Sequence, residues 1–345
     1  MSEFTATAPG RVNLIGEHTD YNGGMVLPAA LSVSLAVTLT PREDDAVNVT
    51  ANDYPDTASR QLSDRAQDAW SDPCVGALQE ARVLGLLSGG ADVSIQSSIP
   101  QGAGLSSSAA LIVAVLKAAR SAAGGMQSDV DLAVAARRVE NDYMGVPCGI
   151  MDQMAVALAT PGTAMALDTK ALEYSLVPLP TMHELVVLHS GVTRKLTEGR
   201  YAIRKEECDT AKAHFGTDDL CLLEPETIRD STLEEPAKSR ALHCATEHLR
   251  VVDAAKALET GDMDRLGALM NESHVSMRDL FDMSLPAIDA LVTDAAAFGA
   301  VGARLTGGGF GGCIVALLEN GTRDEWLAKI TAAHPEARFI DAASG

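Results

Sequence analysis

A dense group of polar side chains stands near the N-terminus of the chain, between Gly10 and the pair Gly23 and Gly24. The group consists of Arg11, Asn13, Glu17, His18, Asp20, Tyr21 and Asn22. Glycine tolerates positive φ and lets the backbone approach a ligand closely, and these side chains offer hydrogen-bond donors and acceptors at short range. The segment therefore indicates either a polar surface turn or a loop that binds a hydroxyl-rich molecule such as a sugar.

A second segment, residues 99–110, is suited to holding a phosphate. It reads Ile-Pro-Gln-Gly-Ala-Gly-Leu-Ser-Ser-Ser-Ala-Ala, after a predicted strand and at the start of a predicted helix. In that context backbone N–H groups and the helix N-terminus bind anions, and Ser106, Ser107 and Ser108 could cap the helix or bind a metal-bound phosphate. The segment is not a Walker A loop, because the chain has no Gly-Lys dipeptide, and Ser107 breaks the dinucleotide fingerprint.

A third segment, residues 307–312, matches the dinucleotide pattern GxGxxG by letter. A strand-like apolar run follows it where that pattern requires a helix, so we reject the dinucleotide interpretation. Five glycines in six positions indicate either a tight turn or a loop packed close to a ligand.

Two carboxylates, Glu140 and Asp152, stand in or near predicted helices. A single Asp in the first turn of a helix is usual, because it interacts favourably with the helix dipole. Phosphoryl transfer, however, needs a carboxylate that holds Mg²⁺ and often another that orients or deprotonates the attacking hydroxyl. If the serine segment binds phosphate, Glu140 and Asp152 are candidates for these two tasks.

Hydrophobic periodicity predicts strands and helices without a regular βαβ alternation, which favours an α+β fold. Strand-like runs cover 33–39, 46–51, 91–97, 163–168, 173–178, 184–189, 314–318 and 338–342. Helical patterns cover 105–123, 129–144, 150–159, 194–213, 237–259, 262–281, 285–299 and 324–333. Residues 52–73 are expected to form a polar surface excursion, and residues 214–236 an irregular acidic segment.

Composition limits the possible functions. The chain has 345 residues, 46% of them hydrophobic, and a net charge of −20, so it can bury a large core and repels nucleic acids. Six irregularly spaced cysteines without a CxxC pair predict reduced thiols in a cytoplasmic protein without a zinc site. The N-terminus lacks the pattern of a signal peptide, and the most apolar run, residues 25–39, is too short and interrupted to span a membrane.

Taken together, the three glycine-containing segments resemble the motifs of the GHMP small-molecule kinases, and among these the galactokinase family. Residues 10–24 resemble the sugar signature, residues 100–110 the ATP-phosphate loop, and residues 302–313 the third motif. Residues 147–153, 190–194 and 273–279 add further similarity, so the resemblance covers nearly the whole chain. It implies a two-domain α+β fold, with an N-terminal domain like the second domain of ribosomal protein S5 and an active site in the interdomain cleft. We expect the domains to cover residues 1–175 and 176–345.

The resemblance also implies roles for individual residues. Asp152 would be the catalytic carboxylate facing the C1 hydroxyl of galactose, with Arg11 near it and near the transferred phosphate. Ser108 and Glu140 would hold Mg²⁺. The nucleotide phosphates of ATP would be held by Gly102, Ala103, Gly104, Leu105, Ser106, Ser107 and Ser108. The sugar hydroxyls would contact Glu17, His18, Asp20, Gly149, Asp152 and Tyr201.

The implied reaction is ATP-dependent formation of galactose 1-phosphate, the entry to galactose catabolism, by a cytoplasmic monomer. An intact serine run with both Glu140 and Asp152 argues against a catalytically inactive sugar and ATP sensor. The sugar signature argues against a mevalonate or homoserine kinase. A kinase for a related sugar such as N-acetylgalactosamine stays open, because the sequence does not show how much room surrounds C2.

Overall fold

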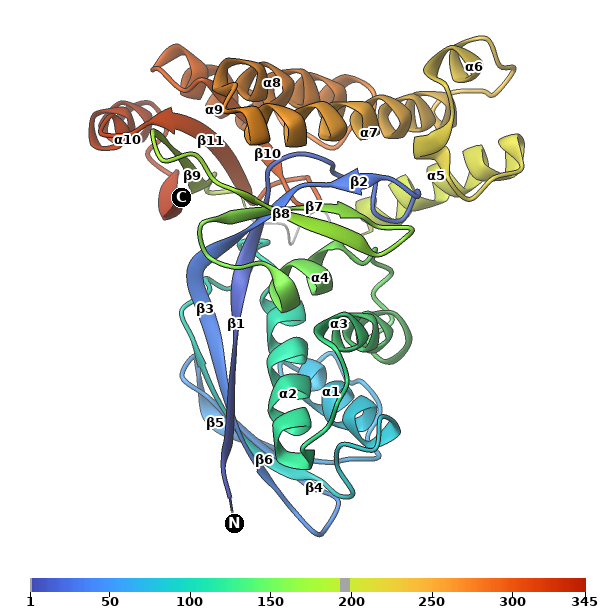
Figure 1. Ribbon diagram of the computed structural model, residues 1–345, viewed down its shortest axis with the longest axis vertical. Coiled ribbons are helices and arrows are strands. Elements are labelled where there is room, and N and C mark those ends of the chain that lie inside the picture. Colours follow the sequence, from blue (N-terminus) through green and yellow to red (C-terminus); the bar gives the residue numbers. More distant parts are fainter. Residues whose placement is uncertain (1, 193–198) are drawn as a thin grey trace. The chain divides into compact units, whose positions relative to one another are not determined.

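The computed structural model describes residues 2–192 and 199–345 (Figure 1). The chain forms two compact units, each made of three segments. Unit 1 consists of Met1–Arg11, Leu31–Gln101 and Leu105–Ala159, and unit 2 of Val12–Ala30, Gly102–Gly104 and Thr160–Gly345. The prediction of two continuous domains that meet at residues 175 and 176 stays a prediction.

Unit 1 contains a mixed sheet. The later part of β3 (Pro28–Pro41) pairs antiparallel with β6 (Ala91–Ser97), which pairs parallel with β4 (Ala46–Ala51). Strand β5 (Tyr54–Gln61) completes this order at the edge next to β4, and β1 (Phe4–Asn13) pairs with β3. The single parallel pair among antiparallel ones fits the predicted α+β class.

Four helices cover one face of this sheet (Figure 1). They are α1 (Asp72–Val83), α2 (Ser107–Ala123), α3 (Asp129–Arg138) and α4 (Met151–Leu158). Helix α2 contacts the other three, and its apolar side chains from Ala109 to Ala119 are buried, as the apolar middle of its sequence requires. This buried helix carries the serine segment at its N-terminus.

Unit 2 contains a short antiparallel group and a second sheet. In the first, β7 (Thr163–Asp168) pairs with β2 (Met25–Val26) and β8 (Glu173–Pro178). The second sheet is wholly antiparallel, with the order β10 (Gly302–Thr306), β11 (Cys313–Glu319), β9 (His183–His189) and β12 (Arg338–Ala343). The helical elements are α5 (Arg200–Phe215), η3 (Leu220–Leu222), α6 (Pro225–Arg229), α7 (Ala237–Thr260), α8 (Met263–Asp279), α9 (Pro286–Ala297) and α10 (Arg323–Ala333).

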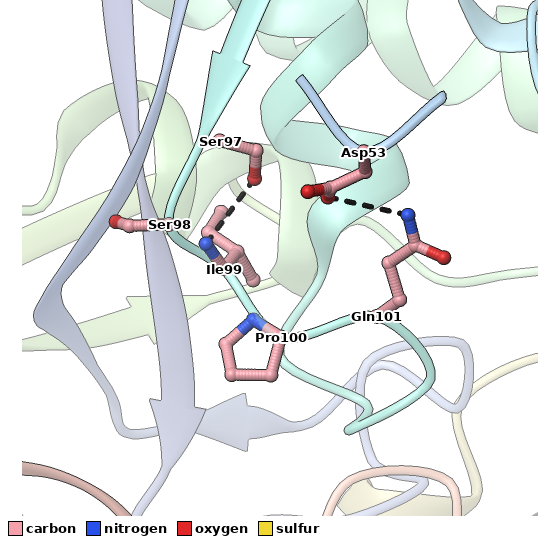
Figure 2. A pocket seen from close by; sticks show the side chains of 6 residues that line it. All are labelled: Asp53, Ser97, Ser98, Ile99, Pro100 and Gln101. Carbon is pink, nitrogen blue, oxygen red and sulfur yellow. Dashed lines mark hydrogen bonds between the residues drawn. The ribbon is translucent and has the colours of Figure 1, made fainter. Parts of the chain in front are cut away.

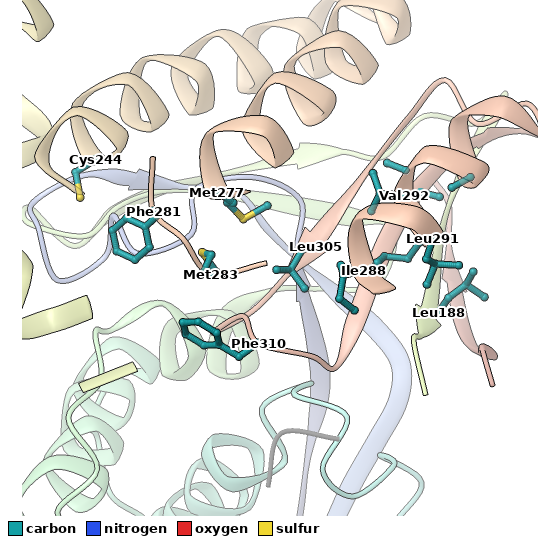
Figure 3. Close-up of a cluster of buried hydrophobic side chains, with 14 of the residues drawn as sticks. Leu188, Cys244, Met277, Phe281, Met283, Ile288, Leu291, Val292, Leu305 and Phe310 are labelled. Carbon is teal, nitrogen blue, oxygen red and sulfur yellow. The ribbon is translucent and has the colours of Figure 1, made fainter. Parts of the chain in front are cut away.

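The core of unit 2 supports the third motif. Buried apolar side chains from β9, β10 and helices α7–α9 form one cluster, in which Phe281, Met283, Leu305 and Phe310 lie near one another (Figure 3). The backbone N–H of Phe310, within the glycine-rich turn, donates to the Met283 carbonyl at 2.8 Å. The third motif is therefore a tight turn anchored to the core, rather than a free loop.

Several predicted elements need correction. Residues 52–73 are polar and mostly exposed or partly exposed, as predicted, but they also contain the unpredicted strand β5 and the first residues of α1. Strand β5 escapes sequence recognition because it is an edge strand whose side chains are mostly exposed and polar. The predicted helix 129–144 ends its α-helical part at Arg138 and continues as a π turn, η1 (Val139–Tyr143). The segment 214–236 contains η3 and α6, and the first residues of the predicted helix 194–213 lie outside the described residues.

No helix in the described part of the chain is long and apolar enough to cross a membrane.

Candidate active site

Two groups of functional side chains are described, one in each unit. The first, which we call the Asp152 cluster, lies in unit 1 and consists of Arg11, Ser108, Glu140, Cys148, Asp152 and Gln153. The second, which we call the Glu17 network, lies in unit 2 and consists of Glu17, Glu247, Arg250, Ser273 and Arg304, with the backbone N–H groups of Gly16 and Gly307.

Arg11 and Asp152 form a bidentate ion pair. Arg11 Nε donates to Asp152 Oδ1 and Arg11 Nη2 donates to Oδ2, both at 2.7 Å. The Arg11 side chain, on β1, is 6% exposed, whereas the Asp152 side chain, in the first turn of α4, is 32% exposed. A fork of two charge-assisted hydrogen bonds fixes the carboxylate plane. The structure thus holds Asp152 in one orientation while leaving part of it open to solvent.

Glu140 is a buried carboxylate close to this pair. It lies in the π turn η1, and Gln153 Nε2 donates to its Oε2. Burial and the negative charge of Asp152 raise the pKa of Glu140, while Ser108, Gln153 and Cys148 act to lower it. Because the charges of Glu140 and Asp152 repel each other, a cation bound between them would stabilise the ionised form of both carboxylates. π turns are rare in proteins as a whole, but many of those that occur are at functional sites. This one places Glu140 opposite Gln153.

The serine segment has the backbone geometry of an anion-binding turn. Gly102 and Ser106 both adopt left-handed conformations, with φ of 69° and 63°, and Ser106 is the N-cap of α2. The buried hydroxyl of Ser106 has no hydrogen-bond partner among the described residues, whereas the Ser108 hydroxyl acts on the Glu140 carboxylate. No acidic side chain stands in the first turn of α2. An unsatisfied buried donor at the start of a helix favours a bound anion.

A pocket of about 430 Å³ lies at the beginning of the serine segment in unit 1 (Figure 2). Its lining residues are Asp53, Ser97, Ser98, Ile99, Pro100 and Gln101. The Gln101 amide donates to Asp53 at 3.2 Å across the pocket wall, and Tyr54, next to Asp53, stacks on Trp70 with ring centroids 4.3 Å apart. The sequence contains no signal for this pocket, because its residue types are ordinary and they come from two separate segments, the turn between β4 and β5 and the end of β6 with the residues after it.

The Glu17 network buries two carboxylates and an arginine. Arg304 Nη2 donates to Glu17 Oε2, and the Gly307 N–H donates to Glu17 Oε1 at 3.0 Å. Burial raises the pKa of Glu17, although Arg304 and Gly307 act against that shift. Glu247 is also buried, but Arg250, His243 and Arg304 outweigh the effect of burial and lower its pKa to about 2. Each charge in this interior is therefore paired, as burial demands.

The other predicted sugar residues of unit 2 lie around an aromatic group. His18, with φ of 61°, stacks on Phe281 at a centroid distance of 4.4 Å and lies 5.0 Å from the Tyr201 ring. His18 Nδ1 lies 2.7 Å from the Tyr21 hydroxyl. Asp20 and Tyr201 are half-buried. The structure thus brings His18 and Tyr201 together, while the carboxylate of Glu17, the residue before His18, lies in the Glu17 network.

Sequence reasoning missed several members of these groups. The sequence around Arg304 indicates that it is functionally or structurally paired, because an arginine inside a buried, largely apolar strand needs a partner for its charge. Glu247 and Gln153 have no such signal, because a single acidic or amide residue in a helix is ordinary. Gly149 is buried in unit 1, three residues before Asp152.

Three family models match ranges of the chain that contain residues of both the Asp152 cluster and the Glu17 network. The chain matches the galactokinase galactose-binding signature over residues 1–41, the GHMP kinases N terminal domain over 72–160 and the GHMP kinases C terminal domain over 254–336. Lactococcus lactis galactokinase complexed with galactose is 30% identical, with a TM-score of 0.94 covering 100% of this chain and 94% of that one. Methanococcus jannaschii mevalonate kinase, at 19% identity, has a TM-score of 0.73 covering 100% of this chain and 99% of that one, and so shares the fold.

Proposed function

This chain belongs to the galactokinase family of the GHMP kinases, and from that premise we propose how its residues phosphorylate galactose. The enzyme transfers the γ-phosphoryl group of ATP to galactose and gives galactose 1-phosphate and ADP. The C1 oxygen forms a bond to the γ-phosphorus, the bond to the bridging β-oxygen breaks, and the hydroxyl proton leaves.

The Arg11–Asp152 fork carries the proposal most directly. A carboxylate whose plane is fixed at 2.7 Å by Arg11, with 32% of its side chain exposed, is suited to accept a hydrogen bond from the C1 hydroxyl. Phosphoryl transfer has a loose transition state, so orientation of the attacking oxygen matters as much as proton removal. We assign Asp152 this orienting role and Arg11 the second task of offsetting charge on the transferring group.

Magnesium fits the residues present. Mg²⁺ takes oxygen ligands, and its protein ligands are commonly one or two carboxylates completed by substrate phosphates. Ser108 offers a hydroxyl that acts on the Glu140 carboxylate, and Glu140 offers a carboxylate near the charge of Asp152. No three His, Cys, Asp or Glu side chains gather as a metal site in the described ranges, so ATP would supply the remaining ligands. The ion would neutralise charge that develops on the phosphates.

We propose that ATP lies along the serine segment, with its phosphates at Gly102, Ala103, Gly104, Leu105, Ser106, Ser107 and Ser108. The pocket that ends at Gln101 adjoins this segment and is large enough for a nucleoside, and the Asp53 carboxylate in its wall can accept a hydrogen bond from an amino or hydroxyl group. The left-handed φ of Gly102, together with open space around its Cβ position, lets the backbone come close to a phosphate.

We further propose that the sugar hydroxyls contact Glu17, His18, Asp20, Gly149 and Tyr201. Buried polar groups that lose a partner when a hydroxyl is inverted or missing are the strongest source of sugar specificity. We also propose that the enzyme acts as a monomer and that it is located in the cytoplasm; the six cysteines, all free thiols in the structure, support the location.

An ADP-release assay tests the proposed function. The purified chain is given ATP and Mg²⁺ with galactose, N-acetylgalactosamine, glucose, mevalonate or homoserine in turn. Galactose should give the highest kcat/KM. Turnover of galactose at the rate of the sugar-free blank would overturn the proposal. Faster turnover of N-acetylgalactosamine would keep the reaction and change the substrate.

A further inference from the structure

We propose that Arg304 is a positioning residue for sugar binding, which acts by holding Glu17 and the turn after β10 in a single arrangement. Arg304 touches no substrate in this scheme. The inference rests on the proposed function, because it assumes that residues 17, 18 and 20 contact galactose.

The first observation is that Arg304 connects separate parts of the signature segment. Its Nη1 donates to the Leu14 carbonyl at 2.7 Å, and its Nη2 donates to the Glu17 carboxylate. Its side chain is fully buried, and Glu17 is 1% exposed. A planar guanidinium can hold a carbonyl and a carboxylate at a fixed angle, whereas a lysine ammonium is a single point of charge. Arg304 therefore fixes both the backbone before Glu17 and the carboxylate itself.

The second observation is that the carboxylates of Glu17 and Glu247, both close to Arg304, also hold backbone N–H groups of neighbouring segments. Glu17 Oε1 accepts the Gly307 N–H at 3.0 Å, and Glu247 Oε1 accepts the Gly16 N–H at 3.0 Å. Arg304 Nη2 also lies 3.8 Å from Glu247 Oε1. The network therefore joins Glu17 and the residues just before it to Gly307, and a shift of Arg304 would move all of them.

The third observation is that the aromatic group depends on this backbone. The Glu17 carbonyl lies 3.2 Å from His243 Nε2, and the next residue is His18, whose ring packs between Phe281 and Tyr201. Gly308, next to Gly307, lies against the Tyr201 ring, which is 3.4 Å from the position of an added Cβ. His18 and Gly308, which both lie against Tyr201, directly follow Glu17 and Gly307. Arg304 holds the Glu17 carboxylate, which in turn accepts the Gly307 N–H.

A merely structural arginine would stabilise the fold without affecting one substrate more than the other. Arg60 is a matched control for that role. It is 8% exposed, pairs with Asp64 and Asp72 at 3.0 and 2.8 Å, and donates to the Arg65 carbonyl at 2.9 Å. It thus has the same combination of two carboxylates and one backbone carbonyl as Arg304, but it lies in unit 1.

The experiment compares Arg304→Lys, Glu247→Gln and Arg60→Lys with the unsubstituted chain. Thermal unfolding, steady-state kinetics and calorimetric titration with galactose are measured on each, below the Tm of the least stable variant. We expect Arg304→Lys to raise the galactose KM and Kd by about tenfold or more, with the ATP KM within about twofold. Glu247→Gln, which keeps an acceptor for Gly16, should change galactose affinity in the same direction by less. Arg60→Lys should lower Tm and leave the galactose KM and Kd unchanged.

The outcomes separate the inference from the proposed function. If Arg304→Lys and Glu247→Gln lower Tm as Arg60→Lys does, with galactose KM and Kd within about twofold of the unsubstituted chain, Arg304 is only structural and the inference is wrong. If Arg304→Lys does not fold, Glu247→Gln decides between the two outcomes by the same criterion. If the unsubstituted chain itself does not phosphorylate galactose, the proposed function fails instead.

Discussion

Replacing Asp152 with asparagine tests the catalytic assignment while changing little in size. Asparagine can accept one hydrogen bond from Arg11, but its amide N–H₂ meets the other Arg11 donor. The pair consists of two hydrogen bonds of 2.7 Å, and the Asp152 side chain is 32% exposed. A hydrogen bond to a charged group contributes about 1.5–3 kcal/mol, which partial exposure reduces, so we expect a stability loss of about 1–2 kcal/mol.

The effect on turnover should be much larger than the effect on folding. A side chain that orients or deprotonates an attacking hydroxyl contributes about 10²–10⁴-fold, so we expect kcat for Asp152→Asn to fall by that factor while the Kd for ATP changes little. Asp129→Asn is the matched control, because Asp129 also stands in the first turn of a helix, is 31% exposed and pairs with Arg120 at 2.8 Å. It should lose similar stability and keep its kcat. A kcat for Asp152→Asn within about threefold of the control would refute the assignment.

Three further predictions concern the metal, the buried glutamate and pH. Ser108→Ala should raise the Mg²⁺ concentration needed for half-maximal activity, and an unchanged Mg²⁺ titration would remove Ser108 from the metal site. Gln153→Met, which deletes the amide donor to Glu140, should weaken Mn²⁺ binding measured by paramagnetic resonance in the presence of ADP, whereas equal binding would contradict the role of that hydrogen bond. Urea unfolding should show stability falling from pH 7 to pH 4, because burial lowers the pKa of His243 to about 4 and the unfolded chain takes up the proton first. This histidine alone accounts for about 3 kcal/mol, and a flat profile would contradict it.

The local parts of the site could be predicted from the sequence, because each is encoded in a short segment. The middle of helix α2 is apolar and the helix begins after a glycine-rich turn, so the sequence predicts a buried helix over residues 105–123, and the structure has one from Ser107 to Ala123. The family's motifs led to Arg11 and Asp152, and the structure pairs them although 141 positions separate them. The assigned roles of both residues stay predictions.

The long-range parts could not be predicted, because one sequence carries no record of which distant residues meet. Glu17 and Arg304 stand 287 positions apart, and nothing in either local segment indicates the other. The π turn at Val139–Tyr143 has no composition that separates it from the helix before it. Strand β5 is polar because it lies at a sheet edge, and edge position follows from topology rather than from local pattern.

The position of the new phosphate on galactose tests the central claim most directly. The purified chain is incubated with galactose, ATP and Mg²⁺, and the products are followed by phosphorus NMR with proton coupling. We predict a phosphate monoester coupled to the proton on C1, formed in step with ADP and lost in Asp152→Asn but not in Asp129→Asn. A phosphate on any other carbon, or ADP formed without a sugar phosphate, would contradict the account.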